Sequence, residues 1–292
     1  MIDRATTFVS TEWLADRLGD PSISVVDASW YLPNANRDAA GEFLTSHIPG
    51  AVYFDLDKVA DTDSGLPHML PSAEQFAATV GKLGISDTQT IVVYDGAGLF
   101  SAPRVWWTFR VMGAKDVRIL EGGFPKWVAE GRPVETGEAK PAAKTFHAEL
   151  DAAQVRSIGD MRGLVADRSA TIVDARPGER FRAEQPEPRA GLRSGHMPGS
   201  RNVPAGSLIA DGKLKSAADI EAAFAAAGVD VSKPIVTSCG SGVTAAILTL
   251  ALGTIGAKDV ALYDGSWAEW GSASDTPVVT GPADATKIGP IP

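Results

Sequence analysis

Short runs of β-branched residues alternate with longer segments of helical periodicity along both halves of the 292-residue chain. In the first half this pattern predicts strands near residues 22–27, 90–94 and 117–121, and helices near 11–18, 72–83 and 103–112. In the second half it predicts strands near 171–174, 234–238 and 260–263, and helices near 217–227 and 243–255. Strands that alternate with helices of this length are typical of an α/β fold, with a mostly parallel sheet covered by helices on both faces.

The two halves also repeat each other in sequence. Gly113-Ala114-Lys115-Asp116-Val117 recurs as Gly256-Ala257-Lys258-Asp259-Val260, at an offset of 143. Four further pairs of segments follow the same order: 25–28 with 172–175, 46–51 with 195–200, 92–98 with 236–242, and 120–123 with 263–266. The repeat predicts two similar domains, which we place at 1–135 and 152–292, joined by a linker at 136–151 that is rich in Pro, Gly, Lys and Glu.

Composition narrows the possible roles of this chain. Apolar residues make up 44% and charged residues 22%, the balance of an ordinary globular protein. The net charge of −9 argues against nucleic acid or an anionic membrane surface as the main partner. The N-terminus has no apolar signal segment, and the most apolar run, residues 245–255, is too short to span a bilayer. We therefore expect a cytoplasmic protein.

A single cysteine, Cys239, stands between a predicted buried strand and a predicted helix. With one thiol the chain forms no internal disulfide, which fits a reducing compartment. Two glycines, Gly240 and Gly242, let the backbone turn tightly around the sulfur. Loop N–H groups and a helix N-terminus both favour negative charge, so this turn is suited to a thiolate. A small buried hydrophobic side chain is the alternative role for a free cysteine.

The repeat provides an internal comparison for that cysteine. Asp95 occupies its place in the first half, followed by Gly96 and Gly98. A carboxylate cannot accept and release sulfur, so we expect the first domain to be catalytically silent. No Cys/His cluster with zinc-ligand spacing is present, and we expect no metal or organic cofactor.

These residues resemble the rhodanese superfamily, and within it the tandem-domain sulfurtransferases, over nearly the whole chain. Residues 239–244 read Cys-Gly-Ser-Gly-Val-Thr, similar to the Cys-Gly-(Ser/Thr)-Gly-Val-Thr signature of the members that use 3-mercaptopyruvate. Members that use thiosulfate usually carry basic residues after the cysteine, as Cys-Arg-Lys-Gly-Val-Thr. Segments 27–33, 101–107 and 263–267 match the family as well.

The resemblance implies two rhodanese-like domains and a sulfur transfer through a persulfide on Cys239. The donor would be 3-mercaptopyruvate, which leaves as pyruvate, and the acceptor a thiol or cyanide. The loop residues Gly240, Ser241, Gly242, Val243 and Thr244 would hold the outer sulfur. A thiosulfate:cyanide sulfurtransferase is the nearest alternative, and a non-catalytic sulfur-relay or interaction module is a distant one. A cysteine phosphatase needs an arginine six residues after the cysteine, where this chain has Ala245.

Arginines are distributed unequally between the two halves. Six lie between Arg176 and Arg201, whereas the matching part of the first half has only Arg37. Arginine suits carboxylate recognition because its planar fork donates two parallel hydrogen bonds. By the resemblance, Arg180 and Arg189 bind the substrate, and the other four are structural or screening residues.

The histidines are more ambiguous. His47 and His196 recur at equivalent places, which favours a shared structural role. The resemblance instead implies that His47 faces the Cys239 loop and acts with Ser241 and an acid, either Asp38 or Glu42.

Other recurring or bulky residues have simpler interpretations. Asp27 and Asp174 recur at strand ends and are interpreted as structural anchors. The tryptophans Trp30, Trp106 and Trp107 are expected in the core and at the domain interface. The expected partners are the small-molecule sulfur donor and an acceptor such as thioredoxin or a small thiol. With two domains already packed together, a monomer is expected.

Overall fold

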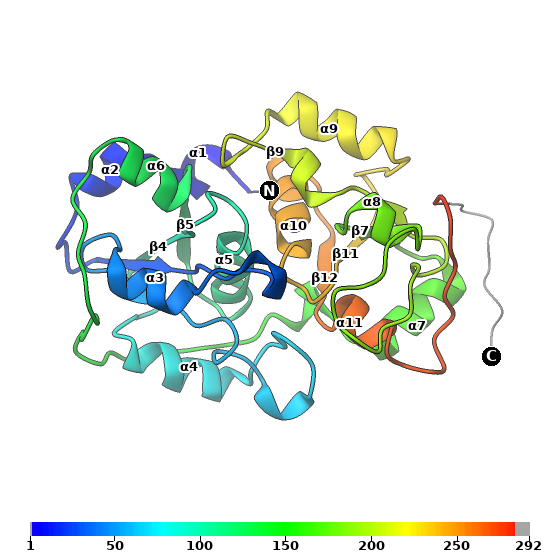
Figure 1. Cartoon of the computed structure of the whole chain (residues 1–292), viewed down its shortest axis with the longest axis horizontal. Helices are drawn as coiled ribbons and strands as arrows, with labels where there is room; N and C mark the ends of the chain where they lie inside the picture. Colours follow the sequence, from blue (N-terminus) through cyan, green and yellow to red (C-terminus); the bar gives the residue numbers. More distant parts are fainter. Residues whose placement is uncertain (1, 284–292) are drawn as a thin grey trace.

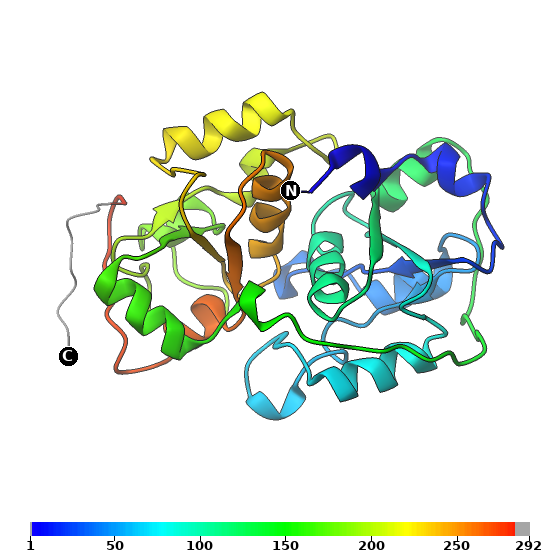
Figure 2. The same cartoon turned by 180° about the vertical axis from the view of Figure 1, so that it is seen from behind.

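The computed structural model describes residues 2–283, which form two α/β domains side by side (Figure 1). Each domain is built on a five-stranded sheet in which every neighbouring pair of strands is parallel. The view from behind shows helices on both faces of the two sheets (Figure 2). This agrees with the α/β fold that the alternating pattern predicts.

The sheet of the first domain has the order β1-β5-β4-β2-β3. Its strands are β1 (Phe8–Val9), β2 (Ile23–Asp27), β3 (Val52–Tyr53), β4 (Thr90–Tyr94) and β5 (Asp116–Leu120). Its helices are α1 (Arg4–Thr7), α2 (Thr11–Ala15), α3 (Ala39–Thr45), α4 (Ala73–Lys82), α5 (Ala102–Val111) and α6 (Gly123–Ala129). Two 3₁₀ turns, η1 (Pro33–Ala35) and η2 (Thr62–Ser64), lie in the connections.

The second domain repeats this topology with the order β6-β12-β11-β7-β8. Its strands are β6 (Val155–Arg156), β7 (Thr171–Asp174), β8 (Arg201–Asn202), β11 (Ile235–Ser238) and β12 (Val260–Tyr263). Its helices are α7 (Ile158–Asp167), α8 (Gly178–Phe181), α9 (Ala217–Ala226), α10 (Ala245–Thr254) and α11 (Ser266–Trp270). An antiparallel hairpin of β9 (Ile209–Ala210) and β10 (Lys213–Leu214) lies outside the sheet, and 3₁₀ turns occur at η3 (Ala152–Gln154) and η4 (Ala205–Leu208).

Every strand and helix expected from the sequence is present, with ends shifted by a few residues. The helix near 72–83 begins as its sequence predicts, because Ser72 and Gln75 form a reciprocal capping box. The outer strands of both sheets were not predicted. They are two residues long, too short to leave a recognisable pattern in the sequence.

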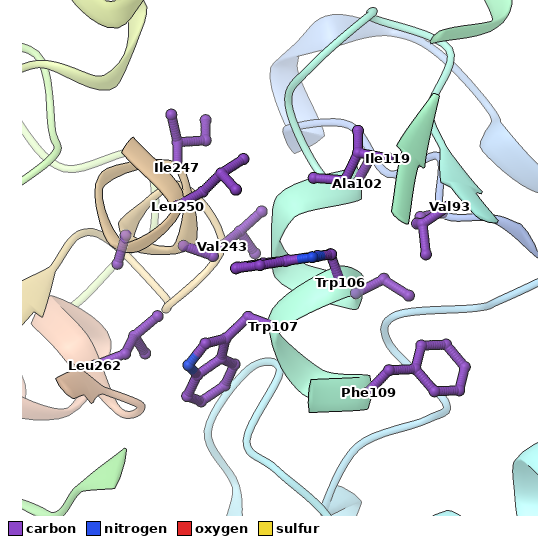
Figure 3. Close-up of a cluster of buried hydrophobic side chains, with 14 of the residues drawn as sticks. Val93, Ala102, Trp106, Trp107, Phe109, Ile119, Val243, Ile247, Leu250 and Leu262 are labelled. Carbon is purple, nitrogen blue, oxygen red and sulfur yellow. The ribbon is translucent and has the colours of Figure 1, made fainter. Parts of the chain in front are cut away.

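Helices α5 and α10 pack against each other at the domain interface (Figure 3). Trp106 and Trp107 of α5 are buried there and approach Val243, Ile247 and other apolar residues of the second domain. One apolar cluster therefore continues from the first domain into the second. The expectation that these two tryptophans pack in the core and at the interface is confirmed.

Between α6 and η3 the chain forms no helix and only an isolated bridge, and it runs along the first domain. Phe146 from this segment is buried against Phe76 and Phe109. The linker at 136–151 stays a prediction, and part of the expected second domain, residues 284–292, lies outside the described residues. Among residues 2–283, no helix has both the length and the apolar character needed to cross a bilayer.

Candidate functional site

A cavity of about 400 Å³ lies between the two domains, with Cys239 in its wall. The second domain contributes Arg180, Arg189 and Ser241, and the first contributes Trp30 and Phe100. Cys239 follows β11 directly and is 2% exposed. The strand-to-helix turn predicted from the sequence thus opens onto an enclosed space at a domain interface, a common place for a binding site.

The loop of residues 239–244 is anchored at its first residue. The N–H group of Cys239 donates to Ser266 Oγ at 3.1 Å, and its carbonyl accepts from the N–H of Trp267 at 2.9 Å. Within the described residues, the N–H groups of the next five residues, 240–244, donate to no protein acceptor. Helix α10 begins directly after them, so its N-terminal N–H groups lie at the same end of the loop. Such convergent unpaired donors form an anion-binding nest.

The matching loop of the first domain is filled by its own side chain. The carboxylate of Asp95 is fully buried and accepts from four backbone N–H groups: Ala97 at 2.9 Å, Phe100 at 2.7 Å, Ser101 at 2.9 Å and Ala102 at 2.8 Å. The corresponding N–H groups of the second domain belong to the Cys239 loop and the first turn of α10. The same backbone geometry therefore binds a carboxylate in one domain and is left open beside a thiol in the other.

Arg180 lies next to the Cys239 loop and shares a buried carboxylate partner, Glu187, with Arg176. One of its Nη atoms would lie 3.3 Å from a Cβ atom at Gly240, so a larger residue there would meet the guanidinium. Its guanidinium pairs with Glu187, which is 1% exposed. Glu187 also accepts from Arg176 at 2.7 Å, and Arg176 is held in addition by Asp174 at 2.7 Å. Arg176 is thus held by two buried carboxylates, although it also lines the cavity, and Glu187 partly offsets the positive charge that Arg180 offers to a ligand.

Arg189 is the cation of the cavity without a carboxylate partner within 4 Å among residues 2–283. Burial lowers the pKa of Arg189 and the neighbouring charge of Arg180 adds to this, while Cys239, Asp57 and Glu187 act in the opposite direction. A half-buried guanidinium with no ion pair is poised to bind an anion.

A second histidine, His68, contacts Arg189 from the first domain. Its Nε2 atom lies 3.4 Å from an Nη atom of Arg189, and its Nδ1 atom lies 3.1 Å from Asp57 Oδ1. Because arginine only donates, Nε2 is the acceptor and Nδ1 carries the proton. Burial lowers the pKa of His68, and the neighbouring arginines add to this while Asp57 opposes it. A lowered pKa and the contact with an arginine both favour the neutral form of His68.

Trp30 connects this histidine to the cavity wall. Its ring packs edge-on against His68 at a centroid distance of 4.8 Å, and its Nε1–H donates to Asp57 Oδ2 at 3.1 Å. The interpretation of Trp30 as ordinary core packing is therefore incomplete, because its ring also lines the cavity.

The expectation that His47 faces the Cys239 loop is wrong. His47 is buried in the first domain, stacks on Phe43 at 4.0 Å and contacts the carbonyl of that residue through Nδ1 at 2.7 Å. His196 repeats both contacts with Phe181, at 3.7 Å and 2.8 Å. The structural role that the repeat favoured is thus the correct one.

The two acids proposed to support His47 have other partners. Asp38 caps α3 by accepting from the N–H of Gly41 at 3.1 Å, and Glu42 pairs with Arg37 at 2.6 Å. The carboxylate beside His47 is that of Glu135, at 3.9 Å.

The comparisons with known proteins agree with this architecture. The family model described as "Rhodanese-like domain" matches twice, at residues 10–130 and 157–273. The chain is 44% identical over 274 residues to the 3-mercaptopyruvate sulfurtransferase of Escherichia coli (strain K12), covering 94% of this chain and 98% of that one. It is also 43% identical over 270 residues to the thiosulfate sulfurtransferase of Rattus norvegicus, covering 90% and 91%. The crystal structure of SseA from Escherichia coli, a 3-mercaptopyruvate sulfotransferase by its description, superposes with a TM-score of 0.84 at 42% identity over 90% of this chain and 99% of that one.

The chain belongs to the rhodanese-like family, among its tandem-domain sulfurtransferases. The two matched segments fall on the two parallel sheets, so each repeat is one rhodanese-like domain. The sequence-based assignment to this family is confirmed.

Sequence reasoning missed His68 and Asp57 in this rhodanese-like chain. Both lie in a part of the first half that has no clear match in the second. The arginines of the second half were recognised as candidate site residues because the first half lacks them. His68 likewise has no counterpart in the second half, so the same comparison of the two halves could have identified it.

Proposed function

We propose that this chain transfers sulfur from 3-mercaptopyruvate to a thiol or cyanide acceptor through a persulfide on Cys239. The observation that carries the proposal is the open set of N–H groups of residues 240–244 beside the thiol. In the first domain, Asp95 accepts from several N–H groups of the matching turn and of the helix start after it. Donors of this kind stabilise a thiolate before the reaction and a persulfide anion after it.

Arg189 and Arg180 would bind the substrate carboxylate. Arg189 has the larger share, because Glu187 already offsets the charge of Arg180. His68 holds Arg189 from behind, and its neutral Nε2 leaves the full guanidinium charge in place. Two arginines on one side of the cavity fix the carboxylate, so the substrate thiol is directed toward Cys239.

The chemical step forms one S–S bond and breaks one C–S bond. The Cys239 thiolate attacks the substrate sulfur, and the electron pair of the C–S bond leaves with the carbon as the enolate of pyruvate. The substrate thiol loses its proton as the persulfide forms, and the enolate carbon gains one proton when pyruvate is released, so the protons balance. The Ser241 hydroxyl lines the cavity without a protein partner in residues 2–283 and is available to donate to the enolate oxygen.

A second nucleophile then removes the outer sulfur and restores the thiolate. A small thiol or a reduced thioredoxin-like protein would serve, as would cyanide, so ping-pong kinetics are expected. A chain with one cysteine depends on an external thiol, which fits a monomer acting in the reducing cytoplasm.

The test is Cys239→Ser, with pyruvate release from 3-mercaptopyruvate and the intact mass of the protein as readouts. We expect the wild-type protein to gain the mass of one sulfur atom after donor treatment and the variant to gain none. Pyruvate release by Cys239→Ser at the wild-type rate would refute the proposal.

Thiosulfate is the second candidate donor, since a relative of similar identity carries that name. Gly240 and Ser241 are uncharged, whereas a thiosulfate dianion would favour a cationic loop. We expect kcat/KM for 3-mercaptopyruvate to exceed that for thiosulfate when cyanide is the common acceptor. The reverse order would assign the chain to the thiosulfate type.

A further inference from the structure

Arg104, on the first turn of α5, is a buried charge at the domain interface. Its side chain is 1% exposed, and it lies outside the wall of the cavity. The guanidinium stacks over the ring of Trp107, with Cζ 4.7 Å from the ring centroid. A fully desolvated arginine is costly unless several acceptors surround it, so its partners show what the fold uses it for.

Three acceptors from three different segments meet at this one guanidinium. Asp264, directly after β12, lies 2.7 Å from Nη2, and Nη2 also donates to the carbonyl of His68 at 2.5 Å. Nη1 donates to the carbonyl of Gly242, in the Cys239 loop, at 3.4 Å. Asp264 in turn accepts from the N–H of Leu70 at 2.7 Å through its other oxygen. The pair of Arg104 and Asp264 thus joins the His68 segment to the loop of the second domain.

Both backbone positions that Arg104 contacts have positive φ angles, which are unusual at His68 and ordinary at Gly242. His68 has φ of 62°, in the left-handed region that non-glycine residues rarely adopt. Gly242 has φ of 76°, and a Cβ atom there would lie 2.7 Å from Arg104 Nη1. The strained conformation at His68 persists when surrounding contacts enforce it, and the Arg104 guanidinium supplies one such contact to the His68 carbonyl as well as one to the carbonyl of Gly242.

The pair is not a general requirement of the repeated fold. When the first residues of α5 and α10 are aligned, Ile247 takes the place of Arg104 and is buried among apolar residues. Glu121 takes the place of Asp264 and forms a more exposed ion pair with Lys213 at 3.3 Å. The buried pair therefore occurs only where the two domains meet at the Cys239 loop.

We propose that Arg104 is a positioning residue for sulfur transfer, which keeps the His68 segment of the first domain in a fixed relation to the Cys239 loop of the second. This inference rests on the function proposed above. Arg104 touches no part of the cavity, so its action is indirect. It aligns His68, which contacts Arg189, with the N–H groups beside the thiol.

The experiment compares Arg104→Lys, Arg104→Met and Arg110→Met. Lysine keeps the charge opposite Asp264 but cannot reach three acceptors in a planar fork. Arg110 lies on the same helix, contacts Trp106 and makes no contact with the Cys239 loop among the described residues, so it is the matched control. Thermal unfolding establishes that each variant is folded before kinetics are measured with 3-mercaptopyruvate and cyanide.

Misalignment of reacting groups by about 1 Å costs up to about 100-fold in rate. We expect kcat to fall by about 10-fold to 100-fold in Arg104→Met and by less in Arg104→Lys, with KM within about threefold of wild type. Arg110→Met should match wild type in both constants. A merely stabilising Arg104 would lower the unfolding temperature and leave kcat unchanged.

The pH profile supplies a second readout. The charged groups around His68 are Asp57, Arg189 and Arg104, with Asp264 adjacent through Leu70. Arg104 is one of the charges that lower the pKa of His68, so Arg104→Met should move the acid limb of kcat/KM to higher pH. Arg104→Lys should leave that limb near its wild-type position.

Each outcome has a separate meaning. If folded Arg104→Lys and Arg104→Met retain wild-type kcat, the inference is overturned. If Arg104→Met does not fold, Arg104→Lys alone provides the test, and wild-type kcat in that folded variant overturns the inference. Wild-type protein that forms no persulfide on Cys239 would instead refute the proposed function.

Discussion

Asp95 and Cys239 stand at the same turn of two repeated domains. The carboxylate of Asp95 accepts from four backbone N–H groups at its turn, whereas the N–H groups of residues 240–244 beside the Cys239 thiol have no protein acceptor among residues 2–283. The first domain thus shows that this turn can hold an anion with backbone donors. In the second domain, the function proposed above would supply that anion as the Cys239 thiolate or as its persulfide.

Replacing Asp95 should affect stability and leave catalysis intact. In Asp95→Ala four backbone N–H groups lose their acceptor, two of them in fully buried hydrogen bonds, and we expect the free energy of unfolding to fall by about 3 kcal/mol. Denaturant unfolding measures the loss, and kcat of the folded variant should match wild type. Asp95→Asn keeps one acceptor oxygen and should lose less. A large fall in kcat at full folding would show that the first domain's loop takes part in the reaction.

The two arginines proposed to bind the substrate should differ in their effect on substrate binding. Arg189→Met removes the cation without an ion pair, so KM for 3-mercaptopyruvate should rise by the equivalent of about 1.5–3 kcal/mol. Arg180→Met should raise KM less, because Glu187 already pairs with Arg180, but should also destabilise the protein. Arg182, paired with Glu184 at the surface, supplies the control. Equal KM values for Arg189→Met and Arg182→Met would remove Arg189 from the site.

The ionisation of His68 should define the acid limb of the activity profile. Burial lowers the pKa of His68, so the midpoint of the acid limb should lie below the ordinary histidine pKa of 6.5. Activity should be lost as His68 gains a proton at low pH. Asp57 favours the protonated form, so Asp57→Asn should move the limb to still lower pH. Rate measurements of kcat/KM between pH 4.5 and 8 check this over roughly the range in which His titrates. A limb that moves upward in Asp57→Asn would contradict the assignment.

Asp27 should make stability depend on pH in the opposite sense to a salt-bridged carboxylate. Burial raises its pKa from 3.8 to about 6, so the folded state binds the proton more tightly than the unfolded state. Stability therefore falls as pH rises through about 4 to 6, by up to about 3 kcal/mol. Asp27→Asn should raise the unfolding temperature at pH 8 and have little effect at pH 4 in thermal scans.

Asp174 is the matched control for that prediction. It occupies the equivalent strand end, but Arg176 pairs with it at 2.7 Å where the first domain has Ser29. Asp174→Asn leaves a buried guanidinium with one partner fewer, so it should destabilise the protein at pH 8. If Asp27→Asn and Asp174→Asn both stabilise the protein at pH 8, Arg176 has no influence on the Asp174 carboxylate.

Much of the fold could be predicted because its signals are local. Buried strands such as β4 and β11 are short apolar runs bounded by turns, and α4 carries its own capping residues. The two-residue outer strands carry no such pattern, since they are defined by their partners. The repeat added information that a single domain lacks, because it placed Asp95 opposite Cys239.

By itself, the sequence determined the two rhodanese-like domains, the single cysteine at a glycine-containing turn, Asp95 at the matching turn and the arginine cluster of the second half. Each of these depends on residues close together in the chain or on comparison of the two repeats. Only the tertiary structure decided which histidine serves the site. His47 and His68 lie in the same half, but the contact of His68 with Arg189 joins residues 121 positions apart. The hydrogen bond of Arg104 to Gly242 joins residues 138 positions apart. It likewise depends on how the two domains pack together, which the spacing of residues along the chain does not reveal.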